Sequence, residues 1–299
     1  MARKQPKQIP QMTVAQFEAA FPNEEACDAY LVARRWTNGV ICPRCGSDRP
    51  YELKTMKFKW ECPDCSPGGY RFSNIAGTIF ENTNVDLRVW FQVIHLLLTS
   101  KKGMSARQIH RYFGFGSYKT AWYMCHRIRA ALMEKDFDKL GGVVEVDETF
   151  IGGKAYNKRG GGGRGGLGSG KIPVVGAISR KGNVVARLIS TVSADVLTKF
   201  VMDSVSDKVS LLVTDEWTGY RHVKKLYPHQ VIKHTAGEYV VGAIHTNTIE
   251  GFWSILKRGI VGNYHKVSKK YLPLYVAEFQ FRYNNRDNAD IFGTAIAGC

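Results

Sequence analysis

Short apolar runs alternate with stretches of helical periodicity along the second half of the chain. Runs rich in β-branched residues favour buried strands, and apolar residues recurring every three or four positions favour helices. The pattern predicts strands over 143–153, 172–180, 183–191, 210–216 and 229–233, and helices over about 194–205, 217–226, 247–260 and 269–286. The second and third strands are so close in sequence that a hairpin turn at 180–183 is expected to join them.

This order of elements is that of an α/β RNase H-like domain with a mixed five-stranded sheet, in which the first and fourth strands are neighbours. Asp147 lies on the first strand, and Asp215 ends the fourth. Charged groups are costly to bury unless they are paired or bind a metal. We therefore expect these two carboxylates to converge on a metal site at one edge of the sheet.

A third carboxylate is expected from the helix at 247–260. Its apolar stripe is formed by Ile249, Phe252, Trp253, Leu256 and Ile260. Glu250 borders this stripe, so it should face the edge of the sheet instead of open water. Lys257 lies two turns further along roughly the same face, where it could hold a phosphate group.

Carboxylates without His or Cys make an all-oxygen site that suits Mg²⁺ or Mn²⁺. Two such ions about 4 Å apart activate an attacking hydroxyl and stabilise the leaving oxygen in displacement at phosphorus. Asp147 would be the bridging ligand. Neighbouring acids are alternatives: Glu145 shares the strand face of Asp147, whereas Glu148 and Glu216 should point the other way.

Four of the seven cysteines follow a regular spacing in the first half of the chain. Cys42, Cys45, Cys62 and Cys65 read as C-x2-C-x16-C-x2-C, the pattern of a zinc ribbon. Two such pairs complete a tetrahedral thiolate site with no open position, which is structural and not catalytic. Disulfides are the alternative, and a reducing cytosol disfavours them.

A helix-turn-helix is expected after the ribbon. Ser105 can cap a short helix that ends near Phe113, the Gly-containing segment 114–117 breaks it, and a second helix follows from about 118 to 133. This is the layout of a DNA-reading unit, although an ordinary helical hairpin has the same pattern. The basic residues expected off its apolar stripe are Lys119, His126, Arg127 and Arg129.

The domain organisation expected from these features covers the whole chain. It consists of a disordered basic arm at 1–12, a helical preface at 13–38, the zinc ribbon at 39–75, a helical DNA-binding domain at 76–138, the RNase H-like domain at 141–290 and a tail at 291–299.

Composition and charge narrow the class of partner. At 44% apolar and 23% charged residues the chain is typical of globular proteins. Its net charge of +16 favours a polyanion, with nucleic acid preferred over a ribosomal or membrane-surface role. No apolar run reaches the roughly 18 residues of a membrane span, and the basic N-terminus lacks a secretory apolar segment. We expect a soluble cytoplasmic protein.

The glycine-rich stretch at 152–171 is not a nucleotide-binding loop. A phosphate-binding P-loop needs Ser or Thr after its Lys, and Ile172 stands there, at the start of a strand. A flexible basic loop is expected instead. The residues expected to contact DNA, here and elsewhere, are Lys119, Arg127, Lys154, Lys158, Arg159, Arg164, Lys171 and Arg258.

Several stretches together resemble the DDE transposases of bacterial insertion sequences that combine a zinc-ribbon N-terminus with an integrase-like catalytic domain. They are "FPNEEACDAYLVARRWTNGVICPRCGS", "VEVDETFIGGK", "LLVTDEWTGY" and "HTNTIEGFWSILKRGIVGNYHKVSKKYLPLYVAEFQFRYNNR". The resemblance extends from about residue 13 to 290.

The resemblance implies magnesium-dependent cleavage and joining of DNA at inverted repeats. It maps the catalytic triad onto Asp147, Asp215 and Glu250, with Lys257 as the associated basic residue. Joining two ends implies a homo-oligomer, at least a dimer, on double-stranded DNA. A stand-alone RNase H-like nuclease and a catalytically silent DNA-binding regulator remain the alternatives.

Overall fold

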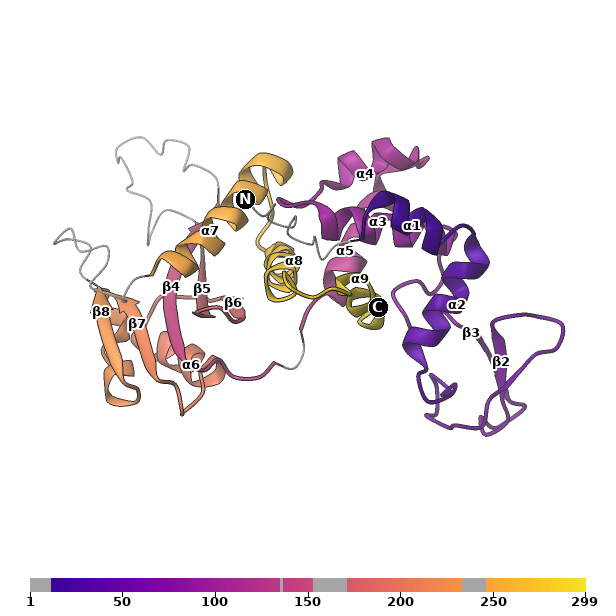
Figure 1. Ribbon diagram of the computed structural model, residues 1–299, viewed down its shortest axis with the longest axis horizontal. Coiled ribbons are helices and arrows are strands. Elements are labelled where there is room, and N and C mark those ends of the chain that lie inside the picture. Colours follow the sequence, from indigo (N-terminus) through magenta and orange to yellow (C-terminus); the bar gives the residue numbers. More distant parts are fainter. Residues whose placement is uncertain (1–11, 135–136, 153–170, 233–245) are drawn as a thin grey trace, which may run out of the picture. The chain divides into compact units, whose positions relative to one another are not determined.

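The computed structural model describes residues 12–134, 137–152, 171–232 and 246–299 (Figure 1). The chain divides into two compact units, one formed by residues 1–132 with 286–299 and the other by 133–285. In the described part of the chain, no helix is both long and apolar enough to cross a membrane.

The helices of the N-terminal unit pack around an aromatic cluster. They are α1 (Val14–Ala20), α2 (Glu24–Arg35), α3 (Leu87–Thr99), α4 (Ala106–Phe113), α5 (Tyr118–Ala131) and α9 (Ile291–Ala297). Phe292 of α9 lies 5.4 Å from the ring of Phe21 and 5.6 Å from that of Phe91. The segment expected as a tail, 291–299, is therefore a buried helix of the N-terminal unit, because its apolar face completes this cluster.

A three-stranded antiparallel sheet forms the ribbon in the same unit. It consists of β1 (Tyr51–Glu52), β2 (Lys59–Cys62) and β3 (Tyr70–Ser73), paired in that order. Trp60 and Phe72 stack on it, and Trp36 packs edge-on against Trp60. This small core includes Cys42, Cys62 and Cys65 of the C-x2-C pairs, whereas Cys45 is exposed.

The expected helix-turn-helix corresponds to α4 and α5. Ser105 caps α4, and Gly114 ends it in the left-handed conformation with φ of 62°. The structure corrects two of the four residues expected off the apolar stripe. Arg129 and His126 are buried, and an Arg129 guanidinium nitrogen donates to the carbonyl of Met104. The interior of this small unit thus takes in side chains that the periodicity assigned to the surface.

The C-terminal unit is built on a mixed five-stranded sheet, as the sequence predicts. Its strands are β4 (Val143–Ile151), β5 (Ile172–Ser179), β6 (Val184–Leu188), β7 (Leu211–Asp215) and β8 (His229–Ile232), in the spatial order β6-β5-β4-β7-β8. The first three strands pair antiparallel, and β4, β7 and β8 pair parallel. This confirms the expected integrase-like arrangement, with β4 at the centre.

Helices cover both faces of this sheet (Figure 1). One face packs against α6 (Ala194–Ser204), and the other against α7 (Asn247–Gly259) and α8 (Leu272–Asn284). The helix expected near 217–226 is instead two short 3-10 turns, η1 (Thr218–Tyr220) and η2 (Val223–Lys225). A π-helical turn, η4 (Ile260–Tyr264), follows α7 directly.

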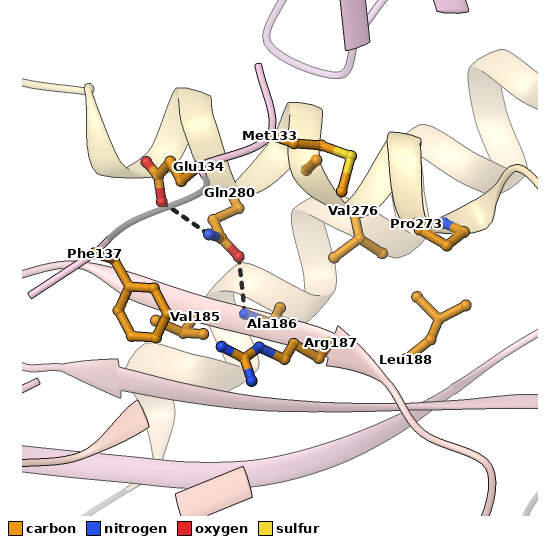
Figure 2. Close-up of a pocket in the computed structure, with 11 residues that line it drawn as sticks. Met133, Glu134, Phe137, Val185, Ala186, Arg187, Leu188, Pro273, Val276 and Gln280 are labelled. Carbon is orange, nitrogen blue, oxygen red and sulfur yellow. Dashed lines mark hydrogen bonds between the residues drawn. The ribbon is translucent and has the colours of Figure 1, made fainter. Parts of the chain in front are cut away.

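The edge strand β6 is protected by amide side chains of α8. Gln280 accepts a hydrogen bond from the backbone N–H of Ala186, and Asn284 accepts one from that of Val184. The Gln280 amide also donates to Glu134 across the floor of a pocket of about 330 Å³ (Figure 2). An unpaired strand edge invites pairing with other chains, and these side chains occupy it.

Candidate active site and zinc centre

The sheet register places the two aspartates on adjacent strands. Glu145 of β4 pairs with Val213 of β7 in parallel, so the same register continued by two residues brings Asp147 beside Asp215. Both aspartates lie where β7 ends, at the rim of the sheet. The convergence that the sequence predicts therefore follows from a single parallel pairing.

Helix α7 lies across this rim on the face of β4 and β5 (Figure 1). The Trp253 indole Nε1–H donates to Asp147 Oδ2 at 3.1 Å, and its ring fills a space above Gly176, the residue opposite Asp147 on β5. A Cβ at position 176 would lie 2.7 Å from two carbons of that ring. A small residue at 176 is therefore a condition for seating α7 this close to the sheet.

Glu250 lies in the first turn of α7, where the Thr246 hydroxyl donates to its Oε1 at 2.9 Å. Its charge acts on Asp147, as does that of Asp215, so the three carboxylates share one electrostatic environment. Burial and these two charges raise the pKa of Asp147 to about 6. The site thus concentrates negative charge that a cation would relieve.

A pocket of about 340 Å³ opens at this rim and collects most of the expected residues. It is lined by Asp147, Glu148, Thr149, Glu250, Trp253, Ser254 and Lys257. Lys257 is exposed two turns along α7 from Glu250 and lines the same pocket. Asp215 acts on the pocket through its charge on Asp147.

Glu148, which the sequence analysis expected to point away from Asp147, also lines this pocket. Strand alternation turns it to the α6 face, where the Tyr220 hydroxyl donates to its Oε2 at 2.7 Å. It nevertheless lines the pocket, because it lies beside Asp147 at the rim. Burial, followed by the charges of Asp215 and Asp147, raises its pKa to about 7. Its position directly after Asp147 was the only sequence signal for a place in this pocket. The contact with Tyr220 joins residues 72 positions apart, which no local pattern indicates.

The four cysteines have the geometry of a structural zinc site. Their sulfur atoms all lie within 4.8 Å of one another, with Cys42 Sγ 3.7 Å from Cys65 Sγ and Cys45 Sγ 3.6 Å from Cys62 Sγ. Four thiolates at about 2.3 Å from a tetrahedral zinc would be about 3.8 Å apart. The donor set and spacing therefore fit Zn²⁺, as the sequence predicts.

Among the residues that the structure describes, the four cysteines are the group of three or more His, Cys, Asp or Glu side chains whose ligand atoms all lie within 4.8 Å of one another. The three carboxylates at the rim are not among the groups that meet that spacing.

Two models of transposase domains match the chain. Residues 22–67 match the transposase zinc-ribbon domain, and residues 139–284 match the ISXO2-like transposase domain. The chain belongs to the transposases that carry these two domains. The four cysteines lie within the first match, and the three carboxylates and Lys257 within the second.

A relative of this transposase is found in an archaeon. The uncharacterized protein in transposable element ISH50 of Halobacterium salinarum is 29% identical over 279 residues, which cover 88% of this chain and 91% of that protein. The solved structure of a simian T-cell lymphotropic virus intasome in complex with PP2A regulatory subunit B56 gamma aligns with 12% identity and a TM-score of 0.32, over 59% of this chain and 68% of that one. The fold assignment rests on the strand order and register, not on that alignment.

The residues expected to contact DNA fall into three groups. Lys119 and Arg258 are exposed, on α5 and α7, and Lys171 immediately precedes β5. Arg127 donates instead to the carbonyls of Ile79 and Glu81, at 3.0 and 3.2 Å, so its guanidinium is engaged by its own unit. Lys154, Lys158, Arg159 and Arg164 lie outside the described residues.

Proposed function

We propose that this transposase binds the ends of an insertion sequence, cleaves the DNA backbone there and joins the freed ends to target DNA. The observation that carries the proposal is the parallel register of β4 and β7, which sets Asp147 beside Asp215 under the helix that brings Glu250. A carboxylate trio of this kind, in an ISXO2-like transposase domain, suits phosphoryl transfer.

The donor set fits Mg²⁺ or Mn²⁺, because it consists of carboxylate oxygens without His or Cys. Asp147, Asp215 and Glu250 are the residues that would hold these ions. When bound, such ions supply charge neutralisation at the phosphate and acidify the attacking hydroxyl. Trp253 holds the Asp147 carboxylate through its indole N–H, and Thr246 holds that of Glu250.

The chemistry is two in-line displacements at phosphorus. In the first, a water oxygen bonds to phosphorus, the bond to the 3′ oxygen breaks, and a 3′-hydroxyl and a 5′-phosphate result. In the second, that 3′ oxygen bonds to a target phosphorus and displaces a target 3′ oxygen, which takes up a proton. Lys257 would hold a non-reacting phosphate beside the carboxylates, and the zinc ribbon with α4 and α5 would bind the element end.

Strand transfer on a labelled duplex carrying the element end, with magnesium, tests this proposal. Glu250→Gln should lower the yield of cleaved and joined product by about 10²-fold or more, since a group that acts in the transition state is lost. Glu216→Gln, which alters an exposed acid next to Asp215, is the matched control and should retain activity.

Other outcomes identify the alternatives. Cleavage without joining would show a stand-alone nuclease. Tight end binding without either reaction would show a DNA-binding regulator with a silent catalytic fold. Equal activity of wild type and Glu250→Gln would remove Glu250 from the site.

A further inference from the structure

Glu145 is a buried acid that lies outside the catalytic pocket. Its side chain has no exposed surface and accepts hydrogen bonds at both oxygens. Oε2 accepts from the backbone N–H groups of Thr248 and Ile249, at 2.9 and 3.1 Å. Oε1 accepts from the Thr248 hydroxyl at 2.8 Å and from Arg180 Nε at 2.8 Å. A carboxylate is buried at this position only because several donors surround it.

These contacts place Glu145 at the N-terminus of α7. The N-cap residue Thr246 makes no capping hydrogen bond with its side chain, which donates to Glu250 instead. The first backbone N–H groups of a helix lack partners within it and carry partial positive charge. A strand residue, 103 positions away in sequence from Thr248, supplies the missing acceptor and a negative charge as well.

The same two segments carry catalytic carboxylates. Glu145 and Asp147 project from one face of β4, two residues apart. Thr248 and Ile249 immediately precede Glu250 in the first turn of α7. The contact between Glu145 and the helix N-terminus therefore fixes the separation between the first acid of the trio and the third.

We infer that Glu145 is a positioning residue that sets Glu250 against Asp147 for joint metal binding. The inference rests on the proposed function, since it assigns Glu250 to the metal site. Glu145 does not touch the reacting phosphate in this role. It acts by holding the N-terminus of α7. Arg180, which directly follows β5, compensates its negative charge.

The affinity of the zinc-loaded full chain for Mn²⁺, measured by titration calorimetry, tests the inference without relying on activity. Glu145→Ala should weaken Mn²⁺ binding by about tenfold or more, as removal of a residue that orients a metal ligand commonly does. Glu145→Gln keeps one acceptor for the helix N–H groups and should restore part of the affinity. Hydrogen exchange at the Thr248 and Ile249 amides should speed up in the alanine variant.

Glu278→Ala is the matched control for loss of a buried acid. Glu278 is also fully buried in this unit, but it contacts Tyr264 and Arg282 and lies on α8. It should lower stability while leaving Mn²⁺ affinity close to that of the wild type. A similar fall in affinity in both variants would show a general effect of destabilisation and would overturn the inference.

A double variant separates failure of the inference from failure of the proposed function. If Glu145 acts through Glu250, adding Glu250→Gln to Glu145→Ala should weaken Mn²⁺ binding little beyond either single change. Fully additive effects, or wild-type affinity in Glu145→Ala, would overturn the inference. Unchanged affinity in Glu250→Gln alone would count against the proposed metal site itself. If Glu145→Ala does not fold, Glu145→Gln decides by the same measurements.

Discussion

The folded protein disfavours the charged form of the Asp147 carboxylate. This carboxylate is partly buried, faces the charges of Asp215 and Glu250, and has its pKa raised from 3.8 to about 6. The hydrogen bond that it accepts from Trp253 lowers this pKa only in part. Residues that serve a reaction commonly cost stability in this way.

Asp147→Asn should therefore stabilise the magnesium-free protein at high pH. The folded state holds the Asp147 proton more tightly than the unfolded state, so the free energy of unfolding falls as pH rises from about 4 to about 6 and stays low above that. At pH 8 the variant should be more stable by about 1–3 kcal/mol, and near pH 4 the difference should vanish. Calorimetry in magnesium-free buffer measures it; a less stable variant at pH 8 would contradict this account.

Gly176→Ala should disturb the site from the opposite side of Trp253. The added methyl would meet the indole ring at 2.7 Å, so the ring or α7 must move away from Asp147. Overpacking of this kind costs about 1–3 kcal/mol of stability. We expect a lower melting temperature and weaker Mn²⁺ binding. Gly251→Ala on α7, where an added Cβ has no atom within 4 Å, is the control: it should leave Mn²⁺ binding unchanged and should not lower the melting temperature, since Ala favours a helix over Gly.

At the scale of elements, the ribbon and α7 are stabilised in different ways. The ribbon has a small core around four thiols, and a metal must hold it together. α7 buries one apolar face on a large sheet and needs only its N-terminus satisfied from outside. The stability of the ribbon therefore depends on the local spacing of its cysteines, and that of α7 depends on a partner strand.

Cys42→Ser should lower the zinc content and destabilise the ribbon, because metal-binding energy is part of its folding energy. Cys27→Ser is the matched control, since Cys27 is also buried but lies outside the cluster. Metal analysis of the purified proteins should find about one zinc per chain in the wild type and the control, and a clear loss in Cys42→Ser. Equal zinc in all three would argue against the site.

At the scale of the whole molecule, the end of the chain belongs to the unit formed by its beginning. α9 returns to the N-terminal helices, where Phe292 packs among Phe17, Phe21 and Phe91. The chain therefore cannot be cut after the C-terminal unit, at about residue 285, without opening the core of the N-terminal one.

Phe292→Ala should destabilise the N-terminal unit by about 3–5 kcal/mol, as expected for removal of a buried ring. Tyr112→Ala, at an exposed aromatic residue of α4, should cost little. Hydrogen exchange by mass spectrometry can follow α1–α3 separately from the five-stranded sheet of the C-terminal unit. Protection lost only in the C-terminal unit would contradict the placement of α9.

The sequence by itself determined the features that depend on local spacing. Cysteine pairs at fixed intervals predict the zinc site, and the periods of strands and helices predict the order of the sheet and the carboxylates at its rim. These patterns are visible because residues two, three or four apart share a face.

Only the tertiary structure decided which distant groups meet. Glu145 accepts a hydrogen bond from Thr248, 103 residues away, and Glu148 accepts one from Tyr220, 72 residues away. α9 joins a core begun at the other end of the chain. A burial pattern shows that a side chain lies inside but does not name its partner. That choice depends on how strands and helices are placed against one another, which no local pattern records.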